Sequence, residues 1–212
     1  MTTEVWYTSY GSNTHVDRLA HYIVGGTPPG ALRTYPGCRD RRLPTASVPV
    51  ELNGALYFAT ESPVWTGGRA FYDPDAEGRV LARAHRVTAE QFADIAAQEM
   101  YREPGPDTAL DLTEVLRDGR AVLGEGRYET LVHPGTLDGL PLLTFTAPWH
   151  LADVAWNAPS ADYLRFLAAG LLAAGAWDAD TVAAYLAACP GAAGHWTERG
   201  IRDLLGSRPG PS

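Results

Sequence analysis

The spacing of hydrophobic and polar residues changes about two thirds of the way along the chain. Before that point, most apolar runs are short and bounded by glycine, proline or aspartate, which is typical of β-strands. After it, apolar residues recur every three or four positions, which is typical of helices. The sequence therefore predicts an α+β protein. Strands are expected at 5–8, 55–59, 69–72, 80–87, 127–132 and 140–146, and helices at 16–23, 88–100, 160–174 and 178–188.

Two of the strand segments carry a more detailed expectation. The last two predicted strands are expected to pair as a hairpin around the glycine-bounded residues 135–139. In the strand 80–87, Arg83 and His85 alternate with small apolar residues. Because successive side chains of a strand point to opposite faces, one face of this strand is predicted to be polar.

The domain organisation is inferred from the uniform composition of the sequence. The sequence has no internal repeat, no low-complexity linker and no clean change of composition. Residues 1–206 are therefore expected to form one domain, and the Pro- and Gly-rich residues 207–212 a disordered tail.

Composition and charge narrow the class of protein. A net charge of -8 argues against nucleic acid as a partner, because phosphate binding needs a basic surface. No apolar run is long enough to cross a bilayer, and the acidic first residues lead directly into a strand, so neither a membrane partner nor a secretory signal is expected. Cys38 and Cys189 match no metal or redox pattern, which favours a reduced, cytoplasmic protein. All 17 basic residues are arginine, a bias typical of GC-rich bacterial genes.

A glycine-containing turn follows the first predicted strand. It consists of Tyr10, Gly11, Ser12 and Asn13, and the helical pattern begins shortly after it. Glycine lets a backbone come close to a ligand, and the N–H groups that follow it can bind an anionic or carbonyl oxygen. The alternative is a plain strand-to-helix turn, capped by Ser12 or Asn13.

The helix predicted at 88–100 carries a carboxylate in an unusual place. Thr88 and Gln91 have the spacing of a capping box. Glu99 falls on the same face as Ile95 and the other apolar residues, where a carboxylate is costly unless it is paired or neutralised. Alternatively, Glu99 turns out to solvent at the helix end or pairs with Arg102. The other sides of the helix carry Glu90, Asp94, Gln98 and Arg102.

Two further clusters are less specific. Trp65 and Arg69 belong to a stretch with paired glycines and three aromatic residues. It is either a loop over a pocket, in which Trp65 stacks on a ligand and Arg69 holds a carboxylate, or a hairpin turn with aromatic core residues. The arginine-rich segment 35–42 is expected to be a solvated loop rather than an anion site. The six histidines have no metal-ligand spacing, so no metal site is predicted.

Three of these segments together resemble a known family. The Tyr10–Asn13 turn after an N-terminal strand is similar to the Y-G-S-N loop of the γ-glutamylcyclotransferase superfamily. Ile95–Glu99 falls where that family has a helix ending in its catalytic glutamate. Pro159–Tyr163, followed by Gly170, is similar to the family's late P-S-x-x-Y helix. Within the superfamily, the sequence resembles the bacterial branch that includes the γ-glutamyl cyclotransferase of butirosin biosynthesis.

The sequence also departs from the family pattern. Ala96 and Ala97 replace the acidic and small residues that often precede the glutamate, and Met100 replaces the usual glycine after it. These changes keep the catalytic carboxylate. They leave the shape of the pocket floor undetermined, and therefore the identity of the substrate as well.

The resemblance implies a fold and a reaction. The fold is α+β, with a small mixed barrel-like or curved sheet, packed helices and a helical C-terminal part. In the implied reaction the α-amine of a γ-glutamyl amine or peptide attacks its own side-chain amide, releasing 5-oxoproline and a free amine. Glu99 is then the acid and base, and Tyr10, Gly11, Ser12 and Asn13 bind the glutamyl oxygens, with Trp65 and Arg69 on the leaving-group side.

The reaction so implied is that of a lyase that needs no cofactor or metal, and a homodimer is compatible with it. Two alternatives stay open from the sequence. One is a non-catalytic small-molecule binding or partner protein on the same fold, and the other is an amide hydrolase that uses the same pocket.

Overall fold

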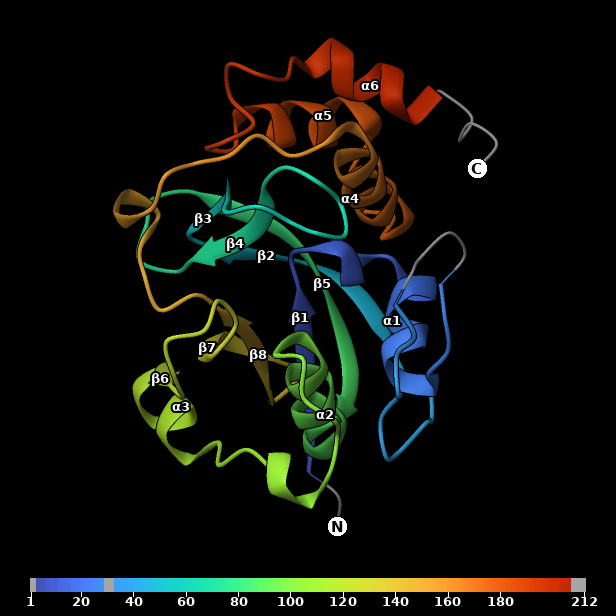
Figure 1. The fold of residues 1–212 in the computed structure, drawn as a ribbon, viewed down its shortest axis with the longest axis vertical. Helices are drawn as coiled ribbons and strands as arrows, with labels where there is room; N and C mark the ends of the chain where they lie inside the picture. The colour runs from blue at the N-terminus through green and yellow to red at the C-terminus, as the bar shows by residue number, and fades with distance from the viewer. Residues whose placement is uncertain (1–2, 29–32, 207–212) are drawn as a thin grey trace. The chain divides into compact units, whose positions relative to one another are not determined.

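The computed structural model describes residues 3–28 and 33–206, which contain eight strands, six α-helices and three short 3-10 turns (Figure 1). The tail predicted at 207–212 lies outside the described residues. The strands are β1 (Glu4–Ser9), β2 (Ser47–Asn53), β3 (Ala55–Ala59), β4 (Arg69–Asp73), β5 (Arg79–Thr88), β6 (Arg120–Val122), β7 (Thr130–Leu137) and β8 (Leu140–Thr146). The α-helices are α1 (Val16–Val24), α2 (Ala89–Glu99), α3 (Thr113–Asp118), α4 (Ala161–Ala173), α5 (Ala179–Ala188) and α6 (Glu198–Gly206), and the 3-10 turns are η1 (Ser12–Thr14), η2 (Pro106–Thr108) and η3 (Leu151–Asp153).

The strands form two sheets, and the predicted α+β class is confirmed. The larger sheet has the order β2-β5-β1-β8-β7-β6, and the smaller one pairs β3 with β4. The larger sheet is mixed, because β1 runs parallel to β8 whereas β7 runs antiparallel to both β6 and β8. It does not close into a barrel, since β2 and β6 are its two edges.

Contacts along the chain define two compact units. The first consists of Met1–Ser9, Val16–Val48 and Ala84–Pro148. The second consists of Tyr10–His15, Pro49–Arg83 and Trp149–Ser212. Compact units can belong to one domain or to two, so the single domain expected over residues 1–206 stays a prediction.

The first unit is built around an aromatic core. Tyr7 of β1 stacks on Phe145 of β8 with ring centroids 5.5 Å apart, and Phe92 of α2 lies against both rings. All three side chains are buried, together with residues from α1, α3, β6 and β7. Burial of this apolar surface is the main source of the unit's stability.

The hairpin predicted in the first unit is confirmed, but its turn is tighter than expected. Leu137 pairs with Leu140, so only Asp138 and Gly139 form the turn. Their φ angles of 51° and 75° are both positive, as a type I′ turn requires and as an Asp-Gly pair readily adopts. Gly135 belongs to β7, next to an irregularity in the strand register.

In the second unit, α4, α5 and α6 pack on one another, and α4 also packs on η1 (Figure 1). Gly170 permits the contact between α4 and η1. A Cβ at this position would lie 2.3 Å from Thr14 Oγ1 and 2.9 Å from the His15 backbone nitrogen. The late glycine of the sequence pattern therefore sets how closely α4 approaches the turn that begins at Ser12.

The sequence did not predict four of the elements, namely β2, β6, α3 and α6. On the predicted polar face of β5, His85 is fully buried and shares a hydrogen bond of 2.8 Å with Ser47 Oγ. From the sequence alone, a polar residue that is buried with a distant hydrogen-bonding partner cannot be distinguished from one that is exposed to solvent. Among the described residues, no helix combines the length and apolarity needed to cross a membrane.

The contact at Gly170 can be tested by adding one methyl group. Alanine favours a helix over glycine by about 1 kcal/mol, but the methyl of Gly170→Ala would overlap backbone atoms and cost about 1–3 kcal/mol. We expect a net loss of unfolding free energy in urea denaturation. Gly105→Ala is the control, because nothing lies within 4 Å of its Cβ and its φ of -174° suits any residue. A Gly170→Ala variant as stable as the control would contradict this packing.

Candidate functional site

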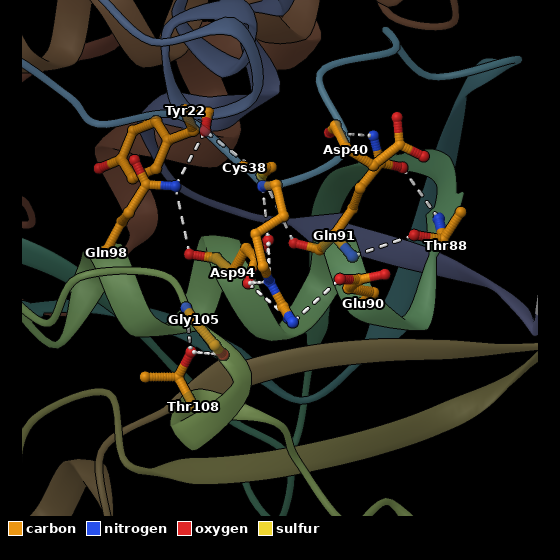
Figure 2. A network of polar contacts seen from close by, with 11 residues as sticks. Tyr22, Cys38, Asp40, Thr88, Glu90, Gln91, Asp94, Gln98, Gly105 and Thr108 are labelled. Atoms are coloured by element: carbon orange, nitrogen blue, oxygen red, sulfur yellow. Dashed lines mark hydrogen bonds and ion pairs between the residues drawn. The ribbon is translucent and has the colours of Figure 1, made fainter.

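The capping box predicted at the start of α2 is confirmed. The backbone N–H of Gln91 donates to Thr88 Oγ1 at 3.0 Å, and the Thr88 N–H donates to Gln91 Oε1 at 3.0 Å. The Gln91 side chain also donates to the carbonyl of Asp40 at 3.0 Å (Figure 2). It donates to the carbonyl of Arg42 as well, at 2.7 Å. The first turn of α2 is thereby stabilised by hydrogen bonds within the turn and by hydrogen bonds to the segment around residue 40.

The side of α2 that carries Asp94 is buried, which the sequence did not indicate. Asp94 is fully buried and accepts three hydrogen-bonding groups of Arg39, namely Nε at 3.0 Å, Nη2 at 2.9 Å and the backbone N–H at 2.8 Å. Arg39 also pairs with Glu90 at 2.9 Å. Arg39 is exposed, as expected for a solvated loop at 35–42, and its charge compensates a buried carboxylate, which the sequence did not indicate.

One turn further along α2, Gln98 fixes the backbone of α1. Its side-chain amide is buried and donates to the carbonyl of Tyr22 at 2.9 Å (Figure 2). Cys38 Sγ donates to the same carbonyl at 3.4 Å, and Arg33 donates to the carbonyl of Gln98 at 2.7 Å. Tyr22 is thus held at its backbone from two sides.

Glu99 is the last residue of α2 and is half-buried. The Tyr22 hydroxyl donates a hydrogen bond to its carboxylate. Burial, and then the negative charge of Glu99, raise the pKa of Tyr22 well above its usual value, so Tyr22 remains a protonated donor at neutral pH. Arg102 pairs with Glu129 and not with Glu99, so the alternative pairing considered from the sequence is wrong.

A buried cation, Arg18, lies close to the Tyr22 ring. The Tyr22 and Tyr35 rings have centroids 4.3 Å apart, and the Arg18 guanidinium lies 5.9 and 5.7 Å from them. Arg18 is 8% exposed and donates to the Tyr35 hydroxyl at 2.9 Å. The carboxylate of Glu99 and the guanidinium of Arg18 both act on the Tyr22 phenol, the carboxylate raising its pKa and the guanidinium lowering it.

The sequence does not point to Tyr22 or Arg18 as members of this group. Tyr22 follows Leu19 by three positions on the apolar face of α1, so it was not distinguishable from a core tyrosine. The only indication in the sequence was that a tyrosine and an arginine lie on one short helix, and this does not identify Glu99 as their partner.

The Tyr10–Asn13 turn belongs to the second unit. Residues Ser12–Thr14 form a 3-10 turn, in which the Thr14 N–H and Oγ1 both donate to the Gly11 carbonyl, at 3.1 and 2.9 Å. Gly11 is the N-cap of this 3-10 turn and makes no side-chain cap. The alternative of a plain strand-to-helix turn capped by Ser12 or Asn13 stays open. The Gly11 N–H donates no hydrogen bond within the described residues.

Aromatic residues surround this turn in the second unit. Tyr10 is buried beside Tyr72, with ring centroids 5.7 Å apart. A Cβ on Gly11 would lie 3.7 Å from the Tyr163 hydroxyl oxygen. Trp65 stacks on the Tyr163 ring at 5.3 Å and 23°, so it is separated from the Gly11 backbone by a single aromatic side chain.

Arg69 lies at the start of β4, after the loop that joins it to β3. Its Nη2 donates to the Glu61 carbonyl, which belongs to the same loop. The hairpin expected as an alternative for this stretch is therefore present, since β3 and β4 pair from Ala55 to Asp73. Whether Trp65 and Arg69 also bind a ligand stays a prediction.

One group of side chains in the described residues has the spacing of metal ligands, namely Asp73, Asp75 and His150, whose ligand atoms lie within 4.8 Å of one another. The Asp73 carboxylate already caps the backbone here, accepting the N–H groups of Leu151 at 2.9 Å and Asp75 at 3.0 Å. Burial raises the pKa of Asp73, but these hydrogen bonds outweigh it and lower the pKa below the usual value.

The fold places the chain in a structural class. A solved structure described as gamma-glutamyl cyclotransferase superimposes with a TM-score of 0.53 and 16% identity, covering 96% of this chain and 98% of that one. An uncharacterized protein from Homo sapiens gives a TM-score of 0.51 and 16% identity, covering 96% of this chain and 99% of that one. This chain therefore has a gamma-glutamyl cyclotransferase-like fold, which confirms the fold class that the resemblance implied.

Sequence comparison adds one curated relative. Histone deacetylase 5 of Arabidopsis thaliana is 29% identical over 201 residues, which cover 86% of this chain. The chain spans about 30% of the length of that relative. No protein-family model matches the chain.

The fully buried carboxylate of Asp94 in α2 makes the stability of the first unit sensitive to Arg39. Removing one partner of a buried ion pair costs about 3–5 kcal/mol, because the other charge is left without compensation. We expect Arg39→Met, which strands the fully buried Asp94, to lose a large part of that amount in urea unfolding. Arg42→Met is the matched control, since the 79% exposed side chain of Arg42 pairs at the surface. Equal losses in the two variants would contradict the role of Arg39.

Proposed function

We propose that this protein is a γ-glutamylcyclotransferase-like amide lyase, which cleaves a γ-glutamyl amine or peptide into 5-oxoproline and a free amine. The observation that carries the proposal is the half-buried carboxylate of Glu99, oriented by the hydroxyl of the buried Tyr22. The gamma-glutamyl cyclotransferase-like fold supports it as well. A fold hosts many functions, so the proposal depends on these side chains rather than on the fold alone.

In the proposed reaction, Glu99 takes a proton from the α-ammonium group of the substrate. The freed amine attacks the side-chain carbonyl carbon and closes a five-membered ring. The bond to the leaving nitrogen then breaks as Glu99 returns the proton to that nitrogen, and the ring nitrogen passes its second proton to the departing amine. Over the whole reaction two protons move from the α-nitrogen to the leaving nitrogen, and no water is consumed. Intramolecular attack in a held geometry has an effective molarity of about 10⁵ M or more, so it supplies much of the rate.

The remaining roles belong to the second group of residues. Backbone N–H groups of Tyr10–Asn13 bind glutamyl oxygens, and the Gly11 N–H, which donates to no described residue, is the best candidate for the oxyanion formed on attack. Trp65 contacts the leaving amine, supported by its stacking on Tyr163. Arg69 has a weaker case as a carboxylate ligand, because one of its terminal nitrogens already donates to the Glu61 carbonyl.

Two other functions fit the same fold. A non-catalytic binding or partner protein would have no need for an acidic side chain held by a buried phenol, so Glu99 argues against it. An amide hydrolase would release free glutamate instead of 5-oxoproline, which makes the product the deciding measurement.

Turnover of γ-glutamyl compounds tests the proposal. The full chain is incubated with γ-glutamyl dipeptides and γ-glutamyl amines, and 5-oxoproline, glutamate and free amine are measured by mass spectrometry. We expect 5-oxoproline and amine in equal amounts. We also expect Glu99→Gln to lower kcat by about 10²–10⁴, the usual share of general acid–base catalysis. Glu103→Gln is the control, because Glu103 is an exposed carboxylate outside α2. Absence of 5-oxoproline across the panel, or full activity of Glu99→Gln, would refute the mechanism.

Tyr22 is expected to act as a positioning residue for Glu99. Tyr22→Phe removes one hydroxyl and keeps the ring that packs on Tyr35. We expect kcat to fall about tenfold, as for the loss of one charge-assisted hydrogen bond, with KM nearly unchanged. A purely structural Tyr22 would lower the stability of the protein but leave kcat unaltered.

A further inference from the structure

Arg83 is a partly buried cation beside the Tyr10–Asn13 turn. It extends from β5, and its Nη1 donates to the carbonyl of Thr14 at 3.3 Å. Thr14 is fully buried and is the last residue of the 3-10 turn η1. The Arg83 guanidinium is therefore fixed against the turn that the proposed function assigns to the glutamyl group.

Arg83 has no acidic partner among the described residues, and this distinguishes it from its neighbours on the same strand. Arg79 pairs with Glu51 at 3.2 Å and Arg86 pairs with Glu4 at 2.5 Å. Arg83 forms no ion pair, and its Nε is buried without a hydrogen-bond partner there. Burial lowers the pKa of Arg83, with no opposing contribution from a nearby carboxylate. A partly buried charge without compensation is costly, so its presence requires a reason.

The nitrogens of Arg83 indicate what the missing partner is. Nη1 is occupied by the Thr14 carbonyl, and Nε is buried. Nη2 makes no hydrogen bond within the described residues and is not among their buried unpaired atoms, so it is open to a ligand. A guanidinium held at one edge and open at another fits a carboxylate, its most common partner in proteins.

We propose that Arg83 binds the α-carboxylate of the substrate's γ-glutamyl group. This inference rests on the proposed function and adds a requirement to it, namely that the substrate carries a free α-carboxylate. With the carboxylate on Arg83, the N–H groups of the Tyr10–Asn13 turn serve the side-chain carbonyl and its oxyanion. A guanidinium near the carboxylate also favours loss of a proton from the adjacent α-ammonium group, because like charges disfavour the charged form.

A pair of substrates isolates the carboxylate. In a 4-aminobutanoyl amide a hydrogen replaces the α-carboxylate of the γ-glutamyl amide, and the same ring closure gives 2-pyrrolidinone. Arg83→Gln removes the charge and keeps a polar side chain with N–H donors. For the γ-glutamyl amide we expect kcat/KM to fall about 100-fold, mainly through KM, as when one partner of a charge pair is lost. For the 4-aminobutanoyl amide we expect little change.

The matched control is Arg79→Gln, which removes an arginine of the same strand whose partner is Glu51. It should leave kcat/KM for both substrates close to that of the unmodified protein. Equal losses by Arg83→Gln on the two substrates would mean that Arg83 only supports the turn, and this would overturn the proposal. Undiminished turnover of the γ-glutamyl amide by Arg83→Gln would overturn it as well.

Binding measurements separate this inference from the proposed function. By calorimetry, 5-oxoproline should bind the unmodified protein and Arg79→Gln equally, and bind Arg83→Gln at least about tenfold more weakly. The carboxylate-free 2-pyrrolidinone should not distinguish the three proteins. If this binding pattern is observed while no γ-glutamyl compound is cleaved, the proposed lyase activity is refuted and the proposed anion site at Arg83 is supported. If 5-oxoproline does not bind the unmodified protein, or binds Arg83→Gln equally well, the anion site is refuted whatever the turnover.

Discussion

The burial of the polar side of α2 is the constraint on which the first unit depends. Gln91, Asp94 and Gln98 follow one another at spacings of three and four, so they lie on one side of the helix. Each is buried, and each is compensated by a group that lies far away in the sequence. The most demanding of the three is Asp94, because a carboxylate out of water is stable only with its Arg39 partner. These bonds set the position of α1 beside the end of α2, where Glu99 receives its hydrogen bond.

This constraint explains which parts of the fold the sequence could predict. Local signals were reliable, because the Thr88 cap and the β7–β8 hairpin depend on residues a few positions apart. Signals that depend on a distant partner failed. Asp94 and His85 look like surface residues in a pattern of apolar and polar positions, and only the fold supplies Arg39 and Ser47 as their partners. The periodicity of a sequence indicates which apolar residues are buried. It does not indicate which polar residues are buried together with a hydrogen-bonding partner.

The same distinction holds at the candidate site. Glu99 stood out as a candidate in the sequence because a carboxylate on an apolar face violates a local rule. Tyr22 violates no such rule, since tyrosine is common in cores, and its role emerges only from the hydrogen bond to Glu99. Arg83 was noted merely as part of a polar strand face. Its unpaired charge became visible only once Arg79 and Arg86, on the same strand, were found with their acidic partners.

The proposed chemistry explains why an anchor such as Arg83 is needed in an acidic protein. A γ-glutamyl chain has several freely rotating bonds between its α-carbon and its amide, and ring closure requires all of them to adopt one arrangement. Holding only the carbonyl oxygen leaves the amine free to swing away, so the entropic advantage of intramolecular attack is lost. A second fixed point at the α-carboxylate removes that freedom. With a net charge of -8, the protein repels anions at long range, so this point must come from a local cation that no protein carboxylate has neutralised. An ion-paired arginine, such as Arg79, cannot fulfil this role without first giving up its own partner.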